Sequence, residues 1–167
     1  TTESDTSTAP SSSGETSAAG GEVALAPDPT LNAPLTPGEN LTKRPITAVG
    51  DSVMLGARAS LVEAMPKVTV DAEVSRQALP TYQRLRDRLA AGKLSQVVVL
   101  HVGTNGPAYE PDLRKAVAAL SDRGRVVLVT AHMPEKWMAE SNTSIRNVAK
   151  DFPNVRLADW AAAAENH

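Results

Sequence analysis

The sequence has no cysteine and only five aromatic residues among its 167. Without cysteine it cannot form a disulfide bond, a thiolate zinc site or a cysteine nucleophile, so redox chemistry says nothing about the compartment. The 17 basic and 19 acidic residues give a net charge of −2, which lacks the basic excess needed to bind phosphate backbones. The shortage of aromatics also removes stacking surfaces for single strands. Nucleic acid is therefore not an expected partner.

Long apolar segments are missing as well. The longest runs, such as Val97 to Val102, fall far short of the roughly 18 residues that span a bilayer. No basic, apolar and small-residue pattern typical of a secretory signal opens the chain. The piece by itself is therefore expected to be soluble. Because it begins at Thr1 and not at methionine, we expect it to be part of a longer product.

The composition divides the chain into two unlike parts. In residues 1–44, 29 positions are Ser, Thr, Ala, Pro or Gly, and no aromatic residue occurs. Such a segment cannot bury enough apolar surface to offset its chain entropy, so we expect a disordered linker. The alternative is a leader added artificially. All five aromatics lie in residues 45–167, which we expect to form one folded domain, incomplete at its C-terminus.

Within residues 45–167, short apolar runs typical of strands alternate with longer segments of helical periodicity. The expected strands are residues 46–49, 67–74, 96–102, 125–131 and 155–158, and the expected helices are residues 52–64, 80–91, 111–120 and 140–150, followed by an Ala-rich helical start. This alternation predicts an α/β fold in which a parallel sheet lies between two layers of helices and is buried on both faces.

Ligands of such sheets bind at the carboxyl ends of the strands, so the residues just after each strand are the candidates for chemistry. The segments there are Gly50-Asp51-Ser52, Ser75-Arg76-Gln77, Gly103-Thr104-Asn105-Gly106, His132-Met133 and Asp159-Trp160.

Ser52 stands where a strand passes into a helix, with Asp51 before it. A hydroxyl in this position can act as a nucleophile while the first helix amides face a developing oxyanion. The alternative is an ordinary helix N-cap, for which Asp and Ser are both favoured. The segment is not the G-x-S-x-G turn of α/β-hydrolases, because Met54 occupies the place of the second glycine.

Asn105 follows the third expected strand, between Gly103 and Gly106. Its side-chain amide could donate to the same oxyanion, and its alternative role is a turn residue that tolerates positive φ. The glycine spacing matches neither a dinucleotide-binding loop nor a P-loop, so nucleotide binding has little support. The isolated histidines and the absence of an H-E-x-x-H segment indicate no metal site, and no cofactor is expected.

Taken together, these segments resemble the SGNH hydrolase superfamily. Gly50-Asp51-Ser52 looks like its nucleophile block, and the segment 99–106 looks like its Gly-x-Asn block. More narrowly, the segment 71–77 and the long polar linker resemble the extracytoplasmic SGNH domain of membrane acyltransferase family 3, which includes peptidoglycan O-acetyltransferases. The resemblance covers roughly residues 45–160 and implies a three-layer sandwich with a flavodoxin-like sheet.

The resemblance also implies roles for single residues. Ser52 would be the nucleophile, and the oxyanion would be held by the Ser52 and Ser75 backbone amides and the Asn105 side chain, with Asp51 and Gly103 in support. Ser75 stands where most of the superfamily has glycine. Its backbone donor survives that replacement only if a non-glycine residue can adopt the local φ.

The superfamily's last block, Asp-x-x-His, supplies the general base and is not found in the sequence. His101 lies within an expected strand, where a buried structural role is expected. His132 ends the fourth strand and is the histidine best placed to approach Ser52, although the superfamily does not take its base from there. His167 follows Asp159 by eight residues, about 12 Å if the segment between them is helical, too far for a hydrogen bond.

Two hypotheses follow. In the first, the chain belongs to an extracytoplasmic, membrane-tethered serine acyltransferase or esterase that passes an acyl group, expected to be acetyl, to a hydroxyl of a cell-wall or surface glycan. Its partners would be an acyl donor, the glycan acceptor and a membrane acyltransferase domain of the parent chain. In the second, it is a non-catalytic SGNH-like module that binds glycan, acyl groups or a membrane acyltransferase partner.

Overall fold

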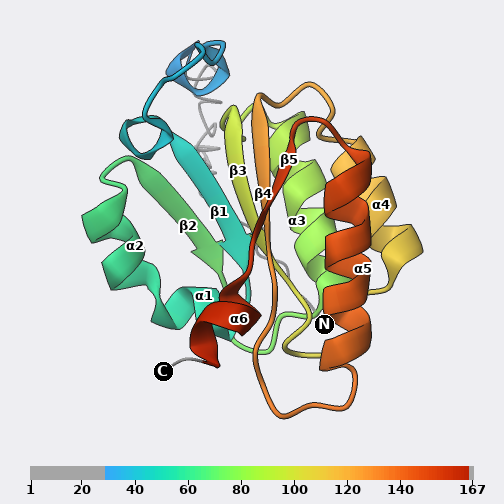
Figure 1. Cartoon of the computed structure of the whole chain (residues 1–167). Coiled ribbons are helices and arrows are strands. Elements are labelled where there is room, and N and C mark those ends of the chain that lie inside the picture. The colour runs from blue at the N-terminus through green and yellow to red at the C-terminus, as the bar shows by residue number, and fades with distance from the viewer. Residues whose placement is uncertain (1–28, 166–167) are drawn as a thin grey trace, which may run out of the picture.

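The computed structural model describes residues 29–165, which fold around a five-stranded parallel sheet (Figure 1). The strands lie in the order β2-β1-β3-β4-β5. Their bounds are β1 (Ile46–Gly50), β2 (Val68–Ala72), β3 (Val97–His101), β4 (Arg125–Val129) and β5 (Val155–Ala158). Val49 pairs with Leu100 of β3, and Gly50 pairs with Ala72 of β2. The carboxyl ends of β2, β1 and β3 are therefore next to one another.

Helices form the two outer layers. They are α1 (Ser52–Gly56), α2 (Arg58–Ala64), α3 (Ala78–Ala90), α4 (Glu110–Ala118), α5 (Met138–Asp151) and α6 (Trp160–Ala164). Figure 1 shows α3, α4 and α5 on one side of the sheet and α1, α2 and α6 on the other. The predicted three-layer architecture with a flavodoxin-like strand order is confirmed. None of the helices within residues 29–165 combines the length and the apolarity that a membrane crossing requires.

The helices differ from the prediction in two places. The expected helix 52–64 is broken into α1 and α2, because Gly56 is a poor helix former and ends the first of them. The helix expected to start at Pro80 begins two residues earlier, at Ala78. A proline is tolerated there because the first four N–H groups of a helix have no partner within it.

The main core lies between the sheet and α3, α4 and α5. Leu100 and Leu128 point into it from the strands and meet Leu85, Leu113 and Ile145 from the helices, each about 1% exposed or less. The other face is covered less completely than the predicted burial on both faces required. Its side chains on β3 and β4, exemplified by Val99, Val127 and Val129, are only partly buried. An apolar strand is buried on both faces only where helices cover both. Here the short helices α1, α2 and α6 leave part of one face open.

Residues 29–44, which belong to the expected linker, contact the folded domain. Residues 29–44 contain two short 3-10 helices (Pro29–Asn32 and Leu41–Lys43) and lie at the amino ends of the strands (Figure 1). The Leu31 carbonyl accepts a hydrogen bond from the Gln96 backbone N–H at 2.8 Å, and the Asn32 side chain accepts one from Arg123 at 3.0 Å. Residues 1–28 of the expected linker lie outside the described residues.

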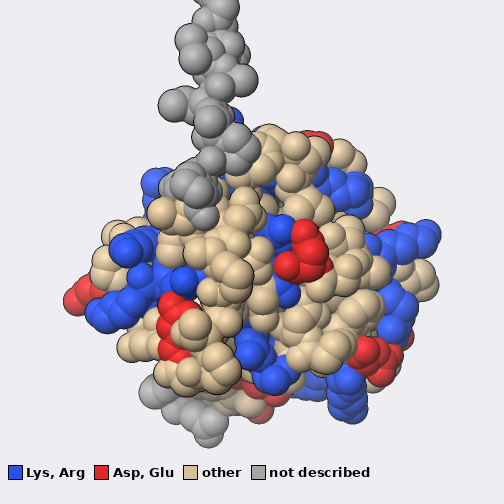
Figure 2. All heavy atoms as spheres, turned by 90° about the horizontal axis from the view of Figure 1, so that it is seen from above, with Lys and Arg blue, Asp and Glu red and all other residues tan. Residues whose placement is uncertain are grey.

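Charged pairs surround this edge. Arg44 forms an ion pair with Glu39 at 3.3 Å and donates to the carbonyl of Pro34, and Arg123 pairs with Asp122. Figure 2, which looks down on this edge, shows basic and acidic side chains interspersed there. The ion pair of Arg44 is internal to the segment, which contacts the domain through the Leu31 carbonyl, the Asn32 side chain and Leu35 beside Gly124.

Substitution of Gly124 by alanine is expected to loosen residues 29–44. A Cβ at Gly124 would lie 2.7 Å from Leu35, so this side chain must move away. We expect a loss of about 1 kcal/mol in stability and faster amide exchange at Gln96, whose N–H bonds to Leu31. The control is Gly56→Ala, because no atom lies within 4 Å of a Cβ there. Equal exchange at Gln96 in both variants would contradict this docking.

Candidate active site

The predicted site residues gather at the carboxyl edge of the sheet. Ser52 follows β1, Ser75 follows β2 and Asn105 follows β3, which are adjacent and parallel strands. The loops are also in contact, since the Asn105 side-chain amide lies 3.4 Å from the Arg76 carbonyl. The Arg76 guanidinium in turn lies 3.4 Å from the carbonyl of Gly50. The structure thus brings together the three segments that the sequence analysis selected.

Ser52 is the first residue of α1, and its side chain is half-buried. The N-cap is Asp51, whose carboxylate accepts a hydrogen bond from the Val53 N–H at 3.0 Å. Because Asp51 performs the capping, the Ser52 hydroxyl is not needed for it. No residue between 29 and 165 forms a hydrogen bond with that hydroxyl. Of the two roles considered for this segment, Asp51 therefore performs the N-cap, and the Ser52 hydroxyl is left available for the role of nucleophile.

Asp51 lies at the centre of a buried network and is 1% exposed. Its carboxylate also accepts hydrogen bonds from the Thr104 hydroxyl and from His101 Nδ1, the latter at 3.1 Å. Burial raises the pKa of Asp51, but the hydrogen bonds from His101, Thr104 and the Val53 N–H outweigh it and hold the pKa below its ordinary value. The network fastens the start of α1 to the end of β3.

Ser75 adopts a left-handed backbone conformation with φ of 61°. A non-glycine residue does occupy the strained region here, which is the condition for a backbone donor at this position. The strain costs on the order of 1 kcal/mol. Within the described part of the chain, the Ser75 N–H donates to no acceptor. It is thus an unpaired donor in the loop that follows β2, the strand next to β1.

Gly103 fixes the turn that carries Asn105. Its φ is 105°, and a Cβ would lie 3.2 Å from the Cβ of Ser141, so both conformation and space favour glycine. The Gly103 carbonyl accepts a hydrogen bond from Trp137 Nε1 at 3.0 Å. The half-buried Asn105 then projects from a turn that is held at both ends.

The histidines do not complete the site. His101 is 3% exposed and bonded to Asp51, in keeping with the expected structural role, and its Nε2 has no partner among residues 29–165. His132 is exposed after β4, two strands from β1 and so about 10 Å away in the sheet. His167 lies outside the described residues. Among those that are described, no histidine bonds to the Ser52 hydroxyl.

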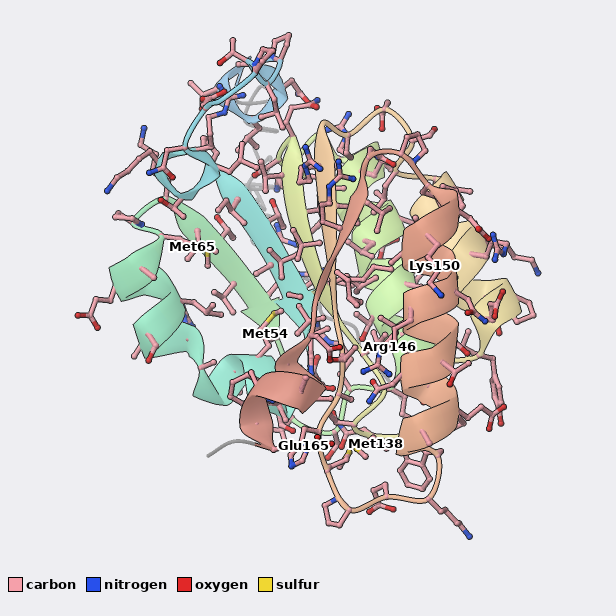
Figure 3. The ribbon with its side chains drawn as sticks, viewed as in Figure 1. Met54, Met65, Met138, Arg146, Lys150 and Glu165 are labelled. Carbon is pink, nitrogen blue, oxygen red and sulfur yellow. The ribbon has the colours of Figure 1, made fainter. Side chains whose placement is uncertain are left out.

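Asp159 marks the same edge at the end of β5. It is the N-cap of α6 and accepts hydrogen bonds from Thr130 at 2.9 Å and from Arg146 at 3.1 Å. These partners lower the pKa of Asp159. Arg146, labelled in Figure 3, belongs to α5 and also forms an ion pair with Asp159 at 3.1 Å. Asp159 is thus engaged in fastening α5, β4 and α6 together.

Two hollows border the site. The first, of about 450 Å³, is apolar and lies over the open face of the sheet; it is lined by Val53, Met54, Ala57, Leu61, Val99, His101, Val129, Ala158, Asp159, Trp160 and Ala163. Met54 projects from α1 toward the sheet in Figure 3. The second, of about 700 Å³, is polar and lies beside Ser75; it is lined by Glu73, Val74, Ser75, Arg76, Gln77, Pro80, Gln83, Arg84 and Asp87. No group of three or more metal-ligating side chains occurs within residues 29–165.

The sequence analysis missed the ion cluster behind the Ser75 loop. Asp71, at the end of β2, accepts from Arg76 at 3.0 Å, Arg84 at 2.7 Å and Arg88 at 2.6 Å. The signal was present in Arg84 and Arg88, which are four residues apart on one face of α3. A buried carboxylate with three cations is a strong local constraint on the loop that follows it.

Stability is expected to fall in acid because of Asp71. Burial raises the pKa of Asp71, but hydrogen bonds from Arg88, Arg84 and Arg76 outweigh it and leave the pKa lowered. The stabilisation is complete above the unfolded value of about 3.9 and is lost as the pH falls through the lower native pKa. Urea unfolding between pH 6 and 2.5 checks this.

Asp71→Asn should make the free energy of unfolding depend less on pH in acid. Asp87→Asn, a substitution on α3, should leave that dependence unchanged. Asp87 is exposed and forms no ion pair within residues 29–165. Parallel acid profiles of the wild type and the Asp71 variant would refute this assignment.

Comparison with known proteins adds to this geometry. No protein-family model matches the sequence. The peptidoglycan O-acetyltransferase OatA of Listeria monocytogenes is 34% identical over 134 residues, which cover 80% of this chain and 21% of OatA. The chain spans about a fifth of the length of the curated relatives it matches.

Solved structures agree with that similarity. The C-terminal catalytic domain of Streptococcus pneumoniae OatA, solved with a methylsulfonyl adduct, matches at a TM-score of 0.68 and 26% identity over 75% of this chain and 74% of that domain. A GDSL-like lipase from Bacteroides thetaiotaomicron matches at a TM-score of 0.50 and 16% identity, over 74% of this chain and 72% of its own, and shows the shared fold alone. The homologues are peptidoglycan O-acetyltransferases, and the resemblance predicted from the three sequence blocks is confirmed.

Proposed function

We propose that this chain, a homologue of the catalytic SGNH domain of peptidoglycan O-acetyltransferases, belongs to an extracytoplasmic serine O-acetyltransferase that modifies hydroxyl groups of cell-wall glycan. One observation carries the proposal. The unbonded Ser52 hydroxyl, the unpaired Ser75 N–H and the Asn105 amide share one edge of the sheet. A nucleophile beside two hydrogen-bond donors for the oxyanion is the smallest set of groups that acyl transfer requires.

The reaction has two halves. Ser52 Oγ attacks the carbonyl carbon of an acetyl donor, and its proton passes to a general base. The negative charge that forms on the carbonyl oxygen is held by the backbone N–H groups of Ser52 and Ser75 and by the Asn105 amide. Collapse of the tetrahedral intermediate expels the donor's leaving group, which takes up the proton. A glycan hydroxyl then attacks acetyl-Ser52 in the same way and frees the serine, and water in its place gives hydrolysis.

The general base comes, in this proposal, from polypeptide outside residues 29–165. The described histidines are poorly suited to the task, since His101 is buried against Asp51 and His132 lies beyond β3. The similar proteins are about five times as long as the matched region, so they contain chain that could supply this group.

The remaining parts of the proposal concern partners. The polar hollow beside Ser75 offers hydrogen-bonding side chains, including Gln77 and Gln83, to the hydroxyl-rich acceptor. A membrane acyltransferase domain of the parent protein would deliver the acetyl group. In this proposal the SGNH domain lies outside the cytoplasm, on the same side of the membrane as the cell wall.

The experiment is to trap acetyl-Ser52. Protein that includes the segment supplying the general base is incubated with p-nitrophenyl acetate, quenched in acid and mapped by peptide mass spectrometry, with a chitin oligosaccharide as acceptor in a parallel sample. We expect one acetyl group on the peptide that contains Ser52, and its transfer to the sugar. Ser52→Ala should abolish both, and Ser60→Ala, an exposed serine on α2, should abolish neither. Acetylation that persists in Ser52→Ala would contradict the proposal.

A non-catalytic module remains the second candidate, favoured by the lack of a histidine bonded to Ser52 within the described part of the chain. It predicts glycan binding that Ser52→Ala leaves intact, with no acetylated serine at any time.

A further inference from the structure

We infer that Arg76 is a positioning residue that holds the Ser75 N–H and the Asn105 amide toward Ser52. The inference rests on the proposed function, because it concerns the oxyanion donors of that same site. It assigns a role to a side chain that touches neither substrate nor reacting atoms.

The guanidinium of Arg76 connects three separate points of the edge. Its Nη1 donates to the backbone carbonyl and the carboxylate of Asp71, both at 3.0 Å, and lies 3.4 Å from the Gly50 carbonyl. Its Nη2 donates to the Glu73 carboxylate at 3.0 Å. The side chain is only 10% exposed, so solvent screens these contacts weakly. One side chain thus fastens the end of β1, the end of β2 and the loop between β2 and α3.

The backbone of Arg76 adds a further connection. Its carbonyl lies 3.4 Å from Nδ2 of Asn105, which is also 3.4 Å from the Thr104 hydroxyl. An amide NH₂ carries two hydrogens, so a bond from one of them to Arg76 fixes the plane in which the other points. Arg76 therefore contacts the nucleophile segment through its side chain and the Asn105 segment through its main chain.

Ser75 requires such support, since it is not glycine. Its left-handed conformation with φ of 61° is unfavourable for an L-residue and persists only where neighbouring contacts impose it. The loop around Ser75 has few apolar contacts, because Val74 is 64% exposed and Ser75 and Gln77 are also exposed. The Arg76 contacts are the constraint nearest to the strained residue.

The ion cluster also provides a matched control. Arg88 donates to the same Asp71 carboxylate at 2.6 Å, but from α3, and within residues 29–165 it forms no hydrogen bond with Gly50 or Asn105. If the arginines merely neutralise Asp71, Arg88→Gln and Arg76→Gln should behave alike. If Arg76 positions the oxyanion donors, only Arg76→Gln should affect them.

The test measures two properties of Arg76→Gln, Arg88→Gln and Glu73→Gln. The kinetic measurement uses protein that includes the segment supplying the general base. There, Arg76→Gln should lower kcat for an acetyl ester by about 10- to 100-fold, with KM changed less than threefold. The reason is that donors misplaced by about 1 Å lose much of their stabilisation of the transition state. Glu73→Gln, at an exposed position, should give a smaller decrease and guards against loss of folding in the first variant. Arg88→Gln should retain the wild-type kcat.

The second measurement is amide hydrogen exchange by NMR in the 167-residue chain. Exchange at residue 76, whose N–H donates to the Glu73 carbonyl at 3.4 Å, should accelerate in Arg76→Gln and not in Arg88→Gln. Unchanged exchange and kcat in Arg76→Gln, or equal effects in both arginine variants, would overturn the inference. If no variant, wild type included, turns over an ester, the proposed function fails, while the exchange rates still decide whether Arg76 holds these loops.

Discussion

Hydrolysis of a simple acetyl ester by the 167-residue chain alone is expected to be slow, at most about 10³- to 10⁴-fold above the reaction in water. Ser52 without a general base retains only positioning and oxyanion stabilisation, whereas a complete triad reaches millions-fold. Ser52→Ala should remove the protein-dependent rate. Initial rates with p-nitrophenyl acetate, corrected for buffer, measure this.

Added imidazole sharpens the same test. A small base that diffuses to Ser52 should raise the rate of the wild-type chain above the rate of imidazole alone, and Ser52→Ala should show no such excess. His132→Ala should behave as the wild type in both conditions. Brisk turnover without imidazole, lost in His132→Ala, would identify His132 as the base and contradict the location proposed for it.

Asp51→Ala is expected to destabilise the fold by about 3 to 5 kcal/mol. The substitution removes the α1 cap and leaves the Val53 N–H, the Thr104 hydroxyl and His101 Nδ1 without their acceptor in a buried place. Urea or thermal unfolding followed by circular dichroism gives the difference. Asp51→Asn should cost less, because its amide oxygen still accepts from Val53 or Thr104.

The control for capping alone is Asp159→Ala. Asp159 caps α6 as Asp51 caps α1, but its side chain is 35% exposed and its partners can turn to water. We expect a loss of about 1 kcal/mol. Similar losses in the two alanine variants would mean that the buried network around Asp51 adds nothing beyond the cap.

Much of the fold followed from local patterns. β5 has the predicted bounds, and the other strands and the helices α3 to α5 differ only at their ends, because apolar periodicity and Gly or Pro boundaries determine them. The gathering of Ser52, Ser75 and Asn105 followed from the rule that parallel strands end at one edge.

Other features depend on contacts between distant residues and leave no local pattern. Residues 29–44 have the composition of a linker, yet they dock because Leu31 and Asn32 find partners at Gln96 and Arg123. The pairing of His101 with Asp51 joins positions 50 residues apart. In the sequence, the arginines of α3 indicate a solvent-exposed helix surface. Only the structure shows that Arg84 and Arg88 pair with Asp71.

The docking of residues 29–44 also fixes where the described chain begins. They lie at the amino edge, and Ser52 lies at the carboxyl edge, a strand length of five residues or about 16 Å away. Pro29 therefore joins the domain on the side remote from Ser52. The edge that carries Ser52, Ser75 and Asn105 is left clear of the docked segment, so a molecule can approach these side chains without displacing residues 29–44.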